Sequence, residues 1–290
     1  MTRLLRYRHD GLTFDVTDQG PLDGDPVVLL HGWPERASSW RKVTPLLHAQ
    51  GLRTYAPDQR GYSPGARPAR RRDYAMQLLV DDAVALVGAI GRPVHLVGHD
   101  WGSSIGWLVA AQRPDLVRTW TAVSVPHPKA FSQALRTTRQ ARKSWYMGAF
   151  QVPGLPEWLA RTGRLDVPLR KGGMTADDVR RFHEEVVDDG AFHYGLMYYR
   201  AMPFAFAALK DSVVRVPTTM VWSDKDVAIT EESVRMNAGL VDAPYEAVTL
   251  RGGWQIGHET LAIRASTCPA SSSGASVGIQ WLTPRSVTAS

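Results

Sequence analysis

The stretch from residue 94 to residue 112 constrains the fold more than any other. A short apolar run, Val94–Val97, is followed by Gly-His-Asp-Trp-Gly at residues 98–102 and then by a helix-like segment, Ser103–Gln112. This order is typical of a sharp strand-to-helix turn in which small residues flank a central nucleophile. Such a turn holds its central residue, here Asp100, above a sheet and near a helix N-terminus, where an anion is favoured. The alternative is an ordinary turn in which the aspartate caps the helix.

The segments around this turn alternate between strand-like and helix-like patterns. This alternation predicts an α/β fold with a mostly parallel central sheet flanked by helices. The expected strands are Leu12–Thr17, Pro26–Leu30, Arg53–Ala56, Val94–Val97, Val117–Val125, Thr218–Trp222 and Tyr245–Leu250. The expected helices are Ala37–Gln50, Tyr74–Ile90, Ser103–Gln112 and Glu231–Ala238.

Residues 127–210 interrupt this alternation. They have no clear buried strand but contain arginine-rich helical segments and several aromatics, so we expect a helical lid inserted into the α/β core. The core then comprises residues 1–126 and 211–264. The C-terminal residues 265–290 include one charged residue and seven serines, a composition typical of a flexible tail.

An aspartate at the centre of the turn restricts the chemistry. A serine that displaced a group from a saturated carbon would leave an ether, which water does not readily cleave. A carboxylate that attacks the same carbon leaves an ester, whose carbonyl an activated water can attack. Asp100 therefore indicates an electrophilic saturated carbon, in an epoxide or an alkyl halide.

A second turn motif, His-Gly-Trp-Pro at residues 31–34, directly follows a predicted strand. A glycine-containing turn at this point can supply a backbone N–H group to an oxyanion hole. We expect the N–H groups of Trp33 and Trp101 to form that pair. His31 is expected to hydrogen-bond within the loop, and the Trp33–Pro34 bond is a candidate cis peptide.

Together these motifs resemble those of the epoxide hydrolases of the α/β-hydrolase fold, and the likeness covers roughly residues 10–262. It is carried by residues 31–35 (His-Gly-Trp-Pro-Glu), 56–62 (Ala-Pro-Asp-Gln-Arg-Gly-Tyr) and 98–102. Asp58, within the second motif, is assigned to a structural turn. The resemblance implies an enzyme that converts a small apolar epoxide into a vicinal diol through a covalent aspartyl ester, without a cofactor.

The same resemblance implies two lid tyrosines that hydrogen-bond and protonate the departing epoxide oxygen. Tyr146 fits the first, because it precedes a Phe-Gln-x-Pro-Gly segment that begins at Phe150. Tyr199 fits the second, because it forms a Tyr-Arg pair late in the predicted lid, with Tyr198 as the alternative. Phe150 and the two turn tryptophans are expected to line the substrate pocket.

The triad acid and base are implied in the same way. Residues 221–228 (Val-Trp-Ser-Asp-Lys-Asp-Val-Ala) resemble the loop that carries the acid, which maps to Asp226, with Asp224 as the alternative. His258 is the only histidine after residue 193, and the order nucleophile, acid, histidine is the usual one for this fold. The sequence departs from the family after this histidine, where a serine-rich segment replaces an aromatic residue and an amphipathic helix.

Two other functions fit the same residues. A haloalkane dehalogenase shares the aspartate, and the indole N–H of Trp101 would then bind the leaving halide. Such an enzyme needs halide donors rather than two lid tyrosines. A non-catalytic, ligand-binding homologue would keep the fold but lose turnover with its altered C-terminus, and would form a stable adduct without product.

No sequence feature indicates a metal site or a nucleic-acid site. His95 and His99 are four residues apart, but on a predicted strand and turn and without the glutamate of a zinc-protease motif. The net charge is +6, yet the arginine cluster at residues 67–72 lacks aromatics for base stacking and is expected to be a solvated loop. No run is apolar enough to span a bilayer, no signal peptide is evident and there is one cysteine. We therefore expect a cytoplasmic protein without membrane insertion, and a homodimer is left open.

Overall fold

The computed structural model describes residues 2–204, 212–251, 262–268 and 276–282. Its centre is an eight-stranded sheet with the order β1-β2-β4-β3-β5-β6-β7-β8. The strands are β1 (Arg6–His9), β2 (Leu12–Gln19), β3 (Asp25–Leu30), β4 (Leu52–Pro57), β5 (Val94–His99), β6 (Val117–Val123), β7 (Thr218–Ser223) and β8 (Tyr245–Leu250). Neighbours from β4 to β8 are parallel, and β1 and β2 are added antiparallel at one edge. The predicted mostly parallel sheet is confirmed.

Helices cover both faces of this sheet. Outside the segment between β6 and β7 they are η1 (Ala37–Lys42), α1 (Thr44–His48), η2 (Pro64–Ala66), η3 (Arg71–Tyr74), α2 (Met76–Ile90), α3 (Trp101–Gln112), η4 (Pro114–Leu116), α11 (Glu231–Arg235) and η7 (Met236–Leu240). Val28 of β3 belongs to the core that includes α2 and α3, whereas the next residue, Leu29, packs with Trp40 and Leu47 of η1 and α1. Successive side chains of a strand point to opposite faces, so a strand buried on both faces is apolar throughout.

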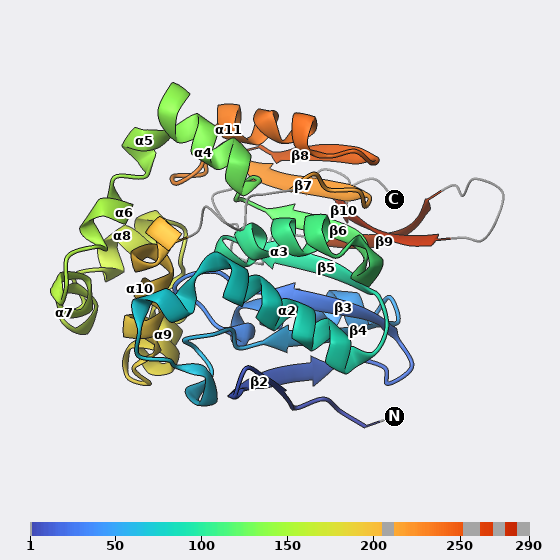
Figure 1. Ribbon diagram of the computed structural model, residues 1–290, viewed down its shortest axis with the longest axis horizontal. Helices are drawn as coiled ribbons and strands as arrows, with labels where there is room; N and C mark the ends of the chain where they lie inside the picture. Colours follow the sequence, from blue (N-terminus) through green and yellow to red (C-terminus); the bar gives the residue numbers. More distant parts are fainter. Residues whose placement is uncertain (1, 205–211, 252–261, 269–275, 283–290) are drawn as a thin grey trace.

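The described part of the chain between β6 and β7 is helical. It contains α4 (Pro128–Thr137), α5 (Gln140–Lys143), α6 (Tyr146–Ala149), α7 (Leu155–Arg161), α8 (Asp166–Lys171), α9 (Ala176–Phe182), the π-helical turn η5 (His183–Val187) and α10 (Ala191–Arg200). We call residues 128–200 the inserted helices. Figure 1 shows them at one end of the sheet. Since β6 leads directly into α4, the carboxyl ends of the parallel strands face the inserted helices.

The edge strand β1 was not predicted from the sequence. Its residues are largely polar, and only Tyr7 is buried. The ring of Tyr7 stacks on that of Phe14 in β2 with centroids 4.7 Å apart, and Arg6 pairs with Asp15 at 2.7 Å. Cross-strand pairs of this kind fix a short edge strand that has no apolar alternation of its own.

The helix expected over Ala37–Gln50 is broken. The chain forms the 3-10 helix η1 up to Lys42 and then the separate helix α1, in which Pro45 occupies the first turn. Proline has no N–H group to donate to the preceding turn. It therefore suits the start of a helix and interrupts a continuous one.

The C-terminal segment contains a hairpin. Strands β9 (Ala262–Cys268) and β10 (Ser276–Leu282) pair antiparallel, which differs from the flexible tail expected over residues 265–290. Both strands place apolar or β-branched residues at alternate positions, including Ile263 and Thr267 in one and Val277 and Ile279 in the other. This period of two favours a strand, and the high serine content had obscured it.

Two helical glycines provide a matched test of the packing. A Cβ on Gly106 of α3 would lie 2.1 Å from the ring of Trp120, whereas Gly88 of α2 is exposed and has no atom within 4 Å of that position. We expect Gly106→Ala to lower the free energy of unfolding by roughly 1–3 kcal/mol through overpacking. Gly88→Ala should raise it by about 0.5–1 kcal/mol, because alanine favours the helix. Urea unfolding of both variants measures this, and equal effects would contradict the described packing of α3 on β6.

Candidate active site

Asp100 lies in the turn between β5 and α3 with φ 51° and ψ −116°. Residues that carry a side chain rarely adopt this conformation. A Cβ on Gly98 would lie 2.3 Å from the carbonyl oxygen of Gly102, and a Cβ on Gly102 would lie 2.2 Å from that of Leu30. The turn therefore closes only with glycine at both positions, and it presents Asp100 in a strained backbone conformation.

The loop after β3 contacts the Asp100 carboxylate. The backbone N–H of Trp33 donates to Oδ2 of Asp100 at 2.8 Å, and the backbone N–H of Trp101 hydrogen-bonds the same carboxylate. A Cβ on Gly32 would lie 2.5 Å from Cβ of Asp100, so only glycine lets the loop approach this closely. The two N–H groups expected to form an oxyanion hole thus converge on Asp100.

The protonation of Asp100 is balanced between two opposing effects. Burial raises the pKa of its carboxyl to about 6, while the N–H groups of Trp33 and Trp101 act in the opposite direction. Removal from water penalises the charged form of an acid, and donors to the carboxylate favour that form. Asp100 is half-buried, and it is a carboxylate, the form that a nucleophile requires, above a pH of about 6.

The five aromatic residues assigned to the site from the sequence form one cluster. Its centre is Tyr199, whose ring centroid lies 5.0 Å from that of Phe150, 5.1 Å from Trp101, 5.6 Å from Trp33 and 6.2 Å from Tyr146. These contacts join two loops of the sheet to α6 and α10 of the inserted helices. The cluster therefore lies where the core meets the inserted helices.

Both candidate tyrosines remain protonated at neutral pH. Burial raises the pKa of Tyr146 and of Tyr199 well above the ordinary value, and the negative charge of Asp100 raises both further. A side-chain hydrogen bond from the indole N–H of Trp101 has the opposite, smaller effect on Tyr199. Two hydroxyl donors thus lie close enough to Asp100 to respond to its charge.

Asp226 lies in the loop after β7, and three hydrogen-bond donors surround its carboxylate. Its Oδ1 accepts from the backbone N–H groups of Ala228 at 2.8 Å and Ile229 at 2.9 Å, and its Oδ2 accepts from the hydroxyl of Ser124 at 2.7 Å. Burial raises the pKa of Asp226, and these donors oppose that shift. The charge of Asp226 in turn raises the pKa of Asp100, so the two carboxylates interact electrostatically. Ser124, at the end of β6, was not singled out in the sequence.

Two residues of α5 hold the loop that carries Asp226. The ammonium group of Lys143 donates to the backbone oxygens of Asp226 at 2.5 Å and Ile229 at 2.9 Å. The side chain of Gln140 is buried, donates to the oxygen of Ala228 at 2.6 Å and accepts from the N–H of Thr230 at 2.9 Å. We call Gln140 and Lys143 the acid-loop clamp. The one signal in the sequence is two polar residues spaced for one face of a helix, but the residues they bond are more than 80 positions away.

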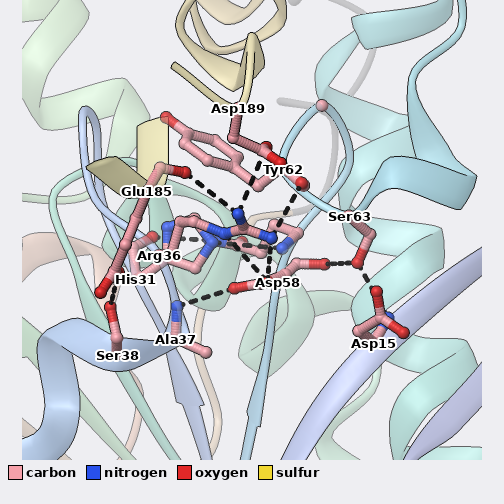
Figure 2. A network of polar contacts seen from close by, with 12 residues as sticks. Asp15, His31, Arg36, Ala37, Ser38, Asp58, Tyr62, Ser63, Glu185 and Asp189 are labelled. Atoms are coloured by element: carbon pink, nitrogen blue, oxygen red, sulfur yellow. Dashed lines mark hydrogen bonds and ion pairs between the residues drawn. The ribbon is translucent and has the colours of Figure 1, made fainter. Parts of the chain in front are cut away.

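A polar network ties the loop after β3 to the inserted helices (Figure 2). Arg36 donates to Oδ2 of Asp58 at 2.6 and 3.0 Å, donates to the backbone oxygen of Glu185 at 3.0 Å, and pairs with Asp189 at 3.3 Å. Oδ1 of Asp58 accepts from the N–H of Ala37 at 2.9 Å. Asp58 therefore has the structural role expected for it.

His31 and Tyr198 both form hydrogen bonds with backbone groups of the loop after β4. Nδ1 of His31 donates to the backbone oxygen of Gly32 at 3.0 Å, so His31 bonds within its loop as predicted. Its Nε2 also accepts from the backbone N–H of Gln59, in the loop after β4, at 3.1 Å. The Trp33–Pro34 bond is cis. The Tyr198 hydroxyl donates to the backbone oxygen of Arg60 at 2.7 Å. This hydrogen bond places the hydroxyl group of Tyr198 in the buried core. His258 lies outside the described residues.

No group of histidine, cysteine, aspartate or glutamate in the described ranges is arranged to hold a metal ion. No helix in that part of the chain is long and apolar enough to cross a bilayer.

Comparisons with known proteins agree with this geometry. A family model described as alpha/beta hydrolase fold matches residues 25–249. AB hydrolase superfamily protein YfhM of Bacillus subtilis is 34% identical over 227 residues, which span 75% of this chain and 79% of the relative. Epoxide hydrolase 3 of Xenopus tropicalis is 31% identical over 261 residues, which span 84% of this chain and 70% of the relative.

Solved structures show the same likeness. An epoxide hydrolase from Vigna radiata is 27% identical with a TM-score of 0.71, and the match covers 86% of this chain and 90% of that one. The epoxide hydrolase of Bacillus megaterium in complex with an inhibitor is 26% identical with a TM-score of 0.72, and the match covers 84% of this chain and 91% of that one.

The raised pKa of Asp100 predicts a cost to stability. Because the folded-state pKa of about 6 exceeds the ordinary value of 3.8, ionisation of Asp100 destabilises the fold increasingly between pH 4 and 6 and fully above that window. We expect Asp100→Asn to be more stable than the wild type at pH 8, by at most about 3 kcal/mol, with the difference shrinking as the pH falls to 4. Urea unfolding at both pH values measures this. A constant difference between the two proteins would refute the raised pKa.

Proposed function

The chain belongs to the epoxide hydrolase family of the α/β-hydrolase fold, and from that premise we propose that it adds water to an epoxide to give a vicinal diol. The observation that carries the proposal is the pairing of one carboxylate, Asp100, with two protonated hydroxyl groups, those of Tyr146 and Tyr199. A nucleophile on one side of a saturated carbon and acids for its leaving oxygen are what ring opening needs. The inserted helices, which carry both tyrosines, act as the lid.

The first half-reaction forms an ester on Asp100. One carboxylate oxygen attacks an epoxide carbon from behind, the carbon–oxygen bond of the ring breaks, and one tyrosine transfers its proton to the released oxygen. The other tyrosine holds the oxygen by a hydrogen bond. The product is a hydroxyalkyl ester of Asp100 and one tyrosinate, which regains its proton in the second half-reaction.

The second half-reaction cleaves the ester. In the proposed mechanism a water attacks the ester carbonyl and gives a proton to His258, which Asp226 orients. The N–H groups of Trp33 and Trp101 stabilise the tetrahedral oxyanion, and one such donor contributes roughly 3–4 kcal/mol. On collapse the departing alkoxide takes the proton from His258 and leaves as the diol. The carboxylic acid formed on Asp100 gives its proton to the tyrosinate, which restores the carboxylate of Asp100 and the tyrosine hydroxyl. The donors around Asp226 support its assignment as the acid, because they fix its carboxylate in one orientation.

A haloalkane dehalogenase is the second candidate. One observation favours it: the indole N–H of Trp33 is buried and has no hydrogen-bond partner among the described residues, and a halide needs such donors. The indole N–H of Trp101, however, hydrogen-bonds Tyr199. A pocket with one free indole and two hydroxyl acids fits a leaving oxygen better than a leaving halide, and assaying diol and halide release together on epoxides and haloalkanes separates the two.

The origin of the oxygen in the diol tests the covalent step. In a single turnover in ¹⁸O-water, the first diol should carry unlabelled oxygen from Asp100, and the label should appear in the Asp100 carboxylate, because the enzyme's oxygen enters the product first. Mass spectrometry of the diol and of the peptide that contains Asp100 measures both. Asp100→Asn should release no diol. Label in the first diol would mean that water attacks the epoxide directly.

The hydroxyl groups of Tyr146 and Tyr199 are the second test. Tyr146→Phe and Tyr199→Phe should each slow ester formation, and the double variant should lose a factor of roughly 10²–10⁴. Tyr198→Phe is the matched control, because its hydroxyl bonds the Arg60 carbonyl and should affect stability rather than ring opening. Stopped-flow measurement of ester formation distinguishes them. Normal ring opening by the double variant would disprove the lid assignment, and unimpaired halide release by it would favour dehalogenation.

A further inference from the structure

Positive charge is concentrated in one part of the inserted helices. Residues 128–171 contain nine basic and two acidic residues, a net charge of +7, whereas the whole chain has a net charge of +6. Both acids are only half-buried but already paired: Glu157 with Arg200 and His193, and Asp166 with His183. The rest of the chain is therefore close to neutral, and this segment presents no exposed acid.

Eight of the nine basic side chains are exposed. They are Lys129, Arg136, Arg139, Arg142, Arg161, Arg164, Arg170 and Lys171. Not one of these eight forms an ion pair with an acidic residue of the described chain, although arginines on the neighbouring α9 do, as Arg180 does with Asp177 and Glu184. Surface charges are usually interspersed with the opposite sign, and a field of one sign attracts an oppositely charged partner.

Large apolar side chains lie exposed among these charges. Trp145 is 73% exposed, Val167 60%, Trp158 50%, Val152 46% and Leu155 40%. The guanidinium of Arg164 lies over the ring of Trp158, 4.5 Å from its centroid. Figure 1 shows α5, α6, α7 and α8 along the same end of the molecule. We call the exposed basic and apolar residues of 128–171 the cationic aromatic face.

We propose that the cationic aromatic face docks on the surface of an anionic lipid membrane. Arginine and lysine are attracted to anionic headgroups, and exposed tryptophan, leucine and valine enter the boundary between headgroups and acyl chains. Neither signal suffices alone, since weak apolar burial and weak charge attraction each give reversible binding. Their combination within one run of helices, with Arg164 directly over the ring of Trp158, is what distinguishes a membrane-binding surface from a merely basic one.

Two other occupants fit the face less well. A second copy of the chain would bring two faces of the same positive charge together, which opposes association. A nucleic acid would satisfy the arginines, but its binding relies on base stacking with aromatics, and three of the five exposed apolar residues are aliphatic. Lipid accounts for both the charges and the aliphatic side chains.

Membrane docking does not depend on the proposed function, but its consequence for the supply of substrate rests on that function. The same helices carry Tyr146, so docking would place the proposed lid against the phase in which an apolar epoxide accumulates. Docking itself needs no turnover. The inactive variant Asp100→Asn should therefore bind membranes as the wild type does, which separates a failure of this proposal from a failure of the enzymatic one.

Co-sedimentation of the full chain with large unilamellar vesicles tests the docking. The protein should bind phosphatidylcholine vesicles that contain about 30 mol% phosphatidylglycerol, and should bind pure phosphatidylcholine much more weakly. Raising the salt from about 50 to about 500 mM should weaken the binding, because surface charges are screened. Equal binding to both vesicles, or none to the anionic ones at low salt, would overturn the proposal.

Paired variants locate the surface. Arg139→Gln with Arg142→Gln should weaken vesicle binding by about 30-fold, at roughly fivefold for each cation, without changing turnover of a dissolved substrate. Arg8→Gln with Arg215→Gln removes the same charge from exposed sites outside the inserted helices and is the matched control. An equal loss in the control pair would mean that overall charge, and not this face, is responsible.

The exposed tryptophans report on insertion. Lipids brominated in their acyl chains should quench part of the tryptophan emission of the bound protein, and Trp145→Phe with Trp158→Phe should abolish that quenching. Unchanged quenching in this variant would place another surface against the lipid. Tighter binding to a single-stranded RNA or to polyglutamate than to anionic vesicles at the same salt would also overturn the proposal, in favour of that class of partner.

Discussion

The close backbone packing beneath Asp100 is the constraint on which the rest of the site depends. The loop after β3, the end of β5 and the start of α3 meet there at distances that a Cβ atom would prevent, at Gly32, Gly98 and Gly102. This packing holds Asp100 in its strained conformation and brings two backbone N–H groups to its carboxylate. The strain is stabilised by the two buried cores on either side of the sheet, which fix all three segments.

Burial has opposite chemical consequences for the acids and hydroxyls of the site. It raises the pKa of Asp100 and Asp226, which makes each carboxylate more basic, and it raises the pKa of Tyr146 and Tyr199, which keeps both as donors. A low-dielectric site thus favours a reactive carboxylate and protonated acids together. Hydrogen bonds from the N–H groups of Trp33 and Trp101 then limit the shift at Asp100, so that the nucleophile remains ionised near neutral pH.

The sequence predicted the features that depend on local patterns. Apolar runs located the strands of the parallel sheet, glycine spacing located the turn at Asp100, and family motifs located the aromatic cluster that the structure brings together. Contacts between distant segments were not predictable: β1 depends on the stacking of Tyr7 on Phe14, and the acid-loop clamp joins α5 to a loop more than 80 residues later. Neither leaves a periodic signal. The assignment of His258 stays a prediction.

The acid-loop clamp makes the site a linked system. The ammonium group of Lys143 lowers the proton affinity of Asp226, and it belongs to α5, next to the segment that carries Tyr146. A ligand that stabilises α5 in this position, with Lys143 bonded to the acid loop, therefore also stabilises the ionised form of Asp226. By thermodynamic reciprocity, protonation of Asp226 weakens the binding of that ligand by the same factor. Ligand binding beneath the inserted helices and the protonation of Asp226 are thus thermodynamically linked.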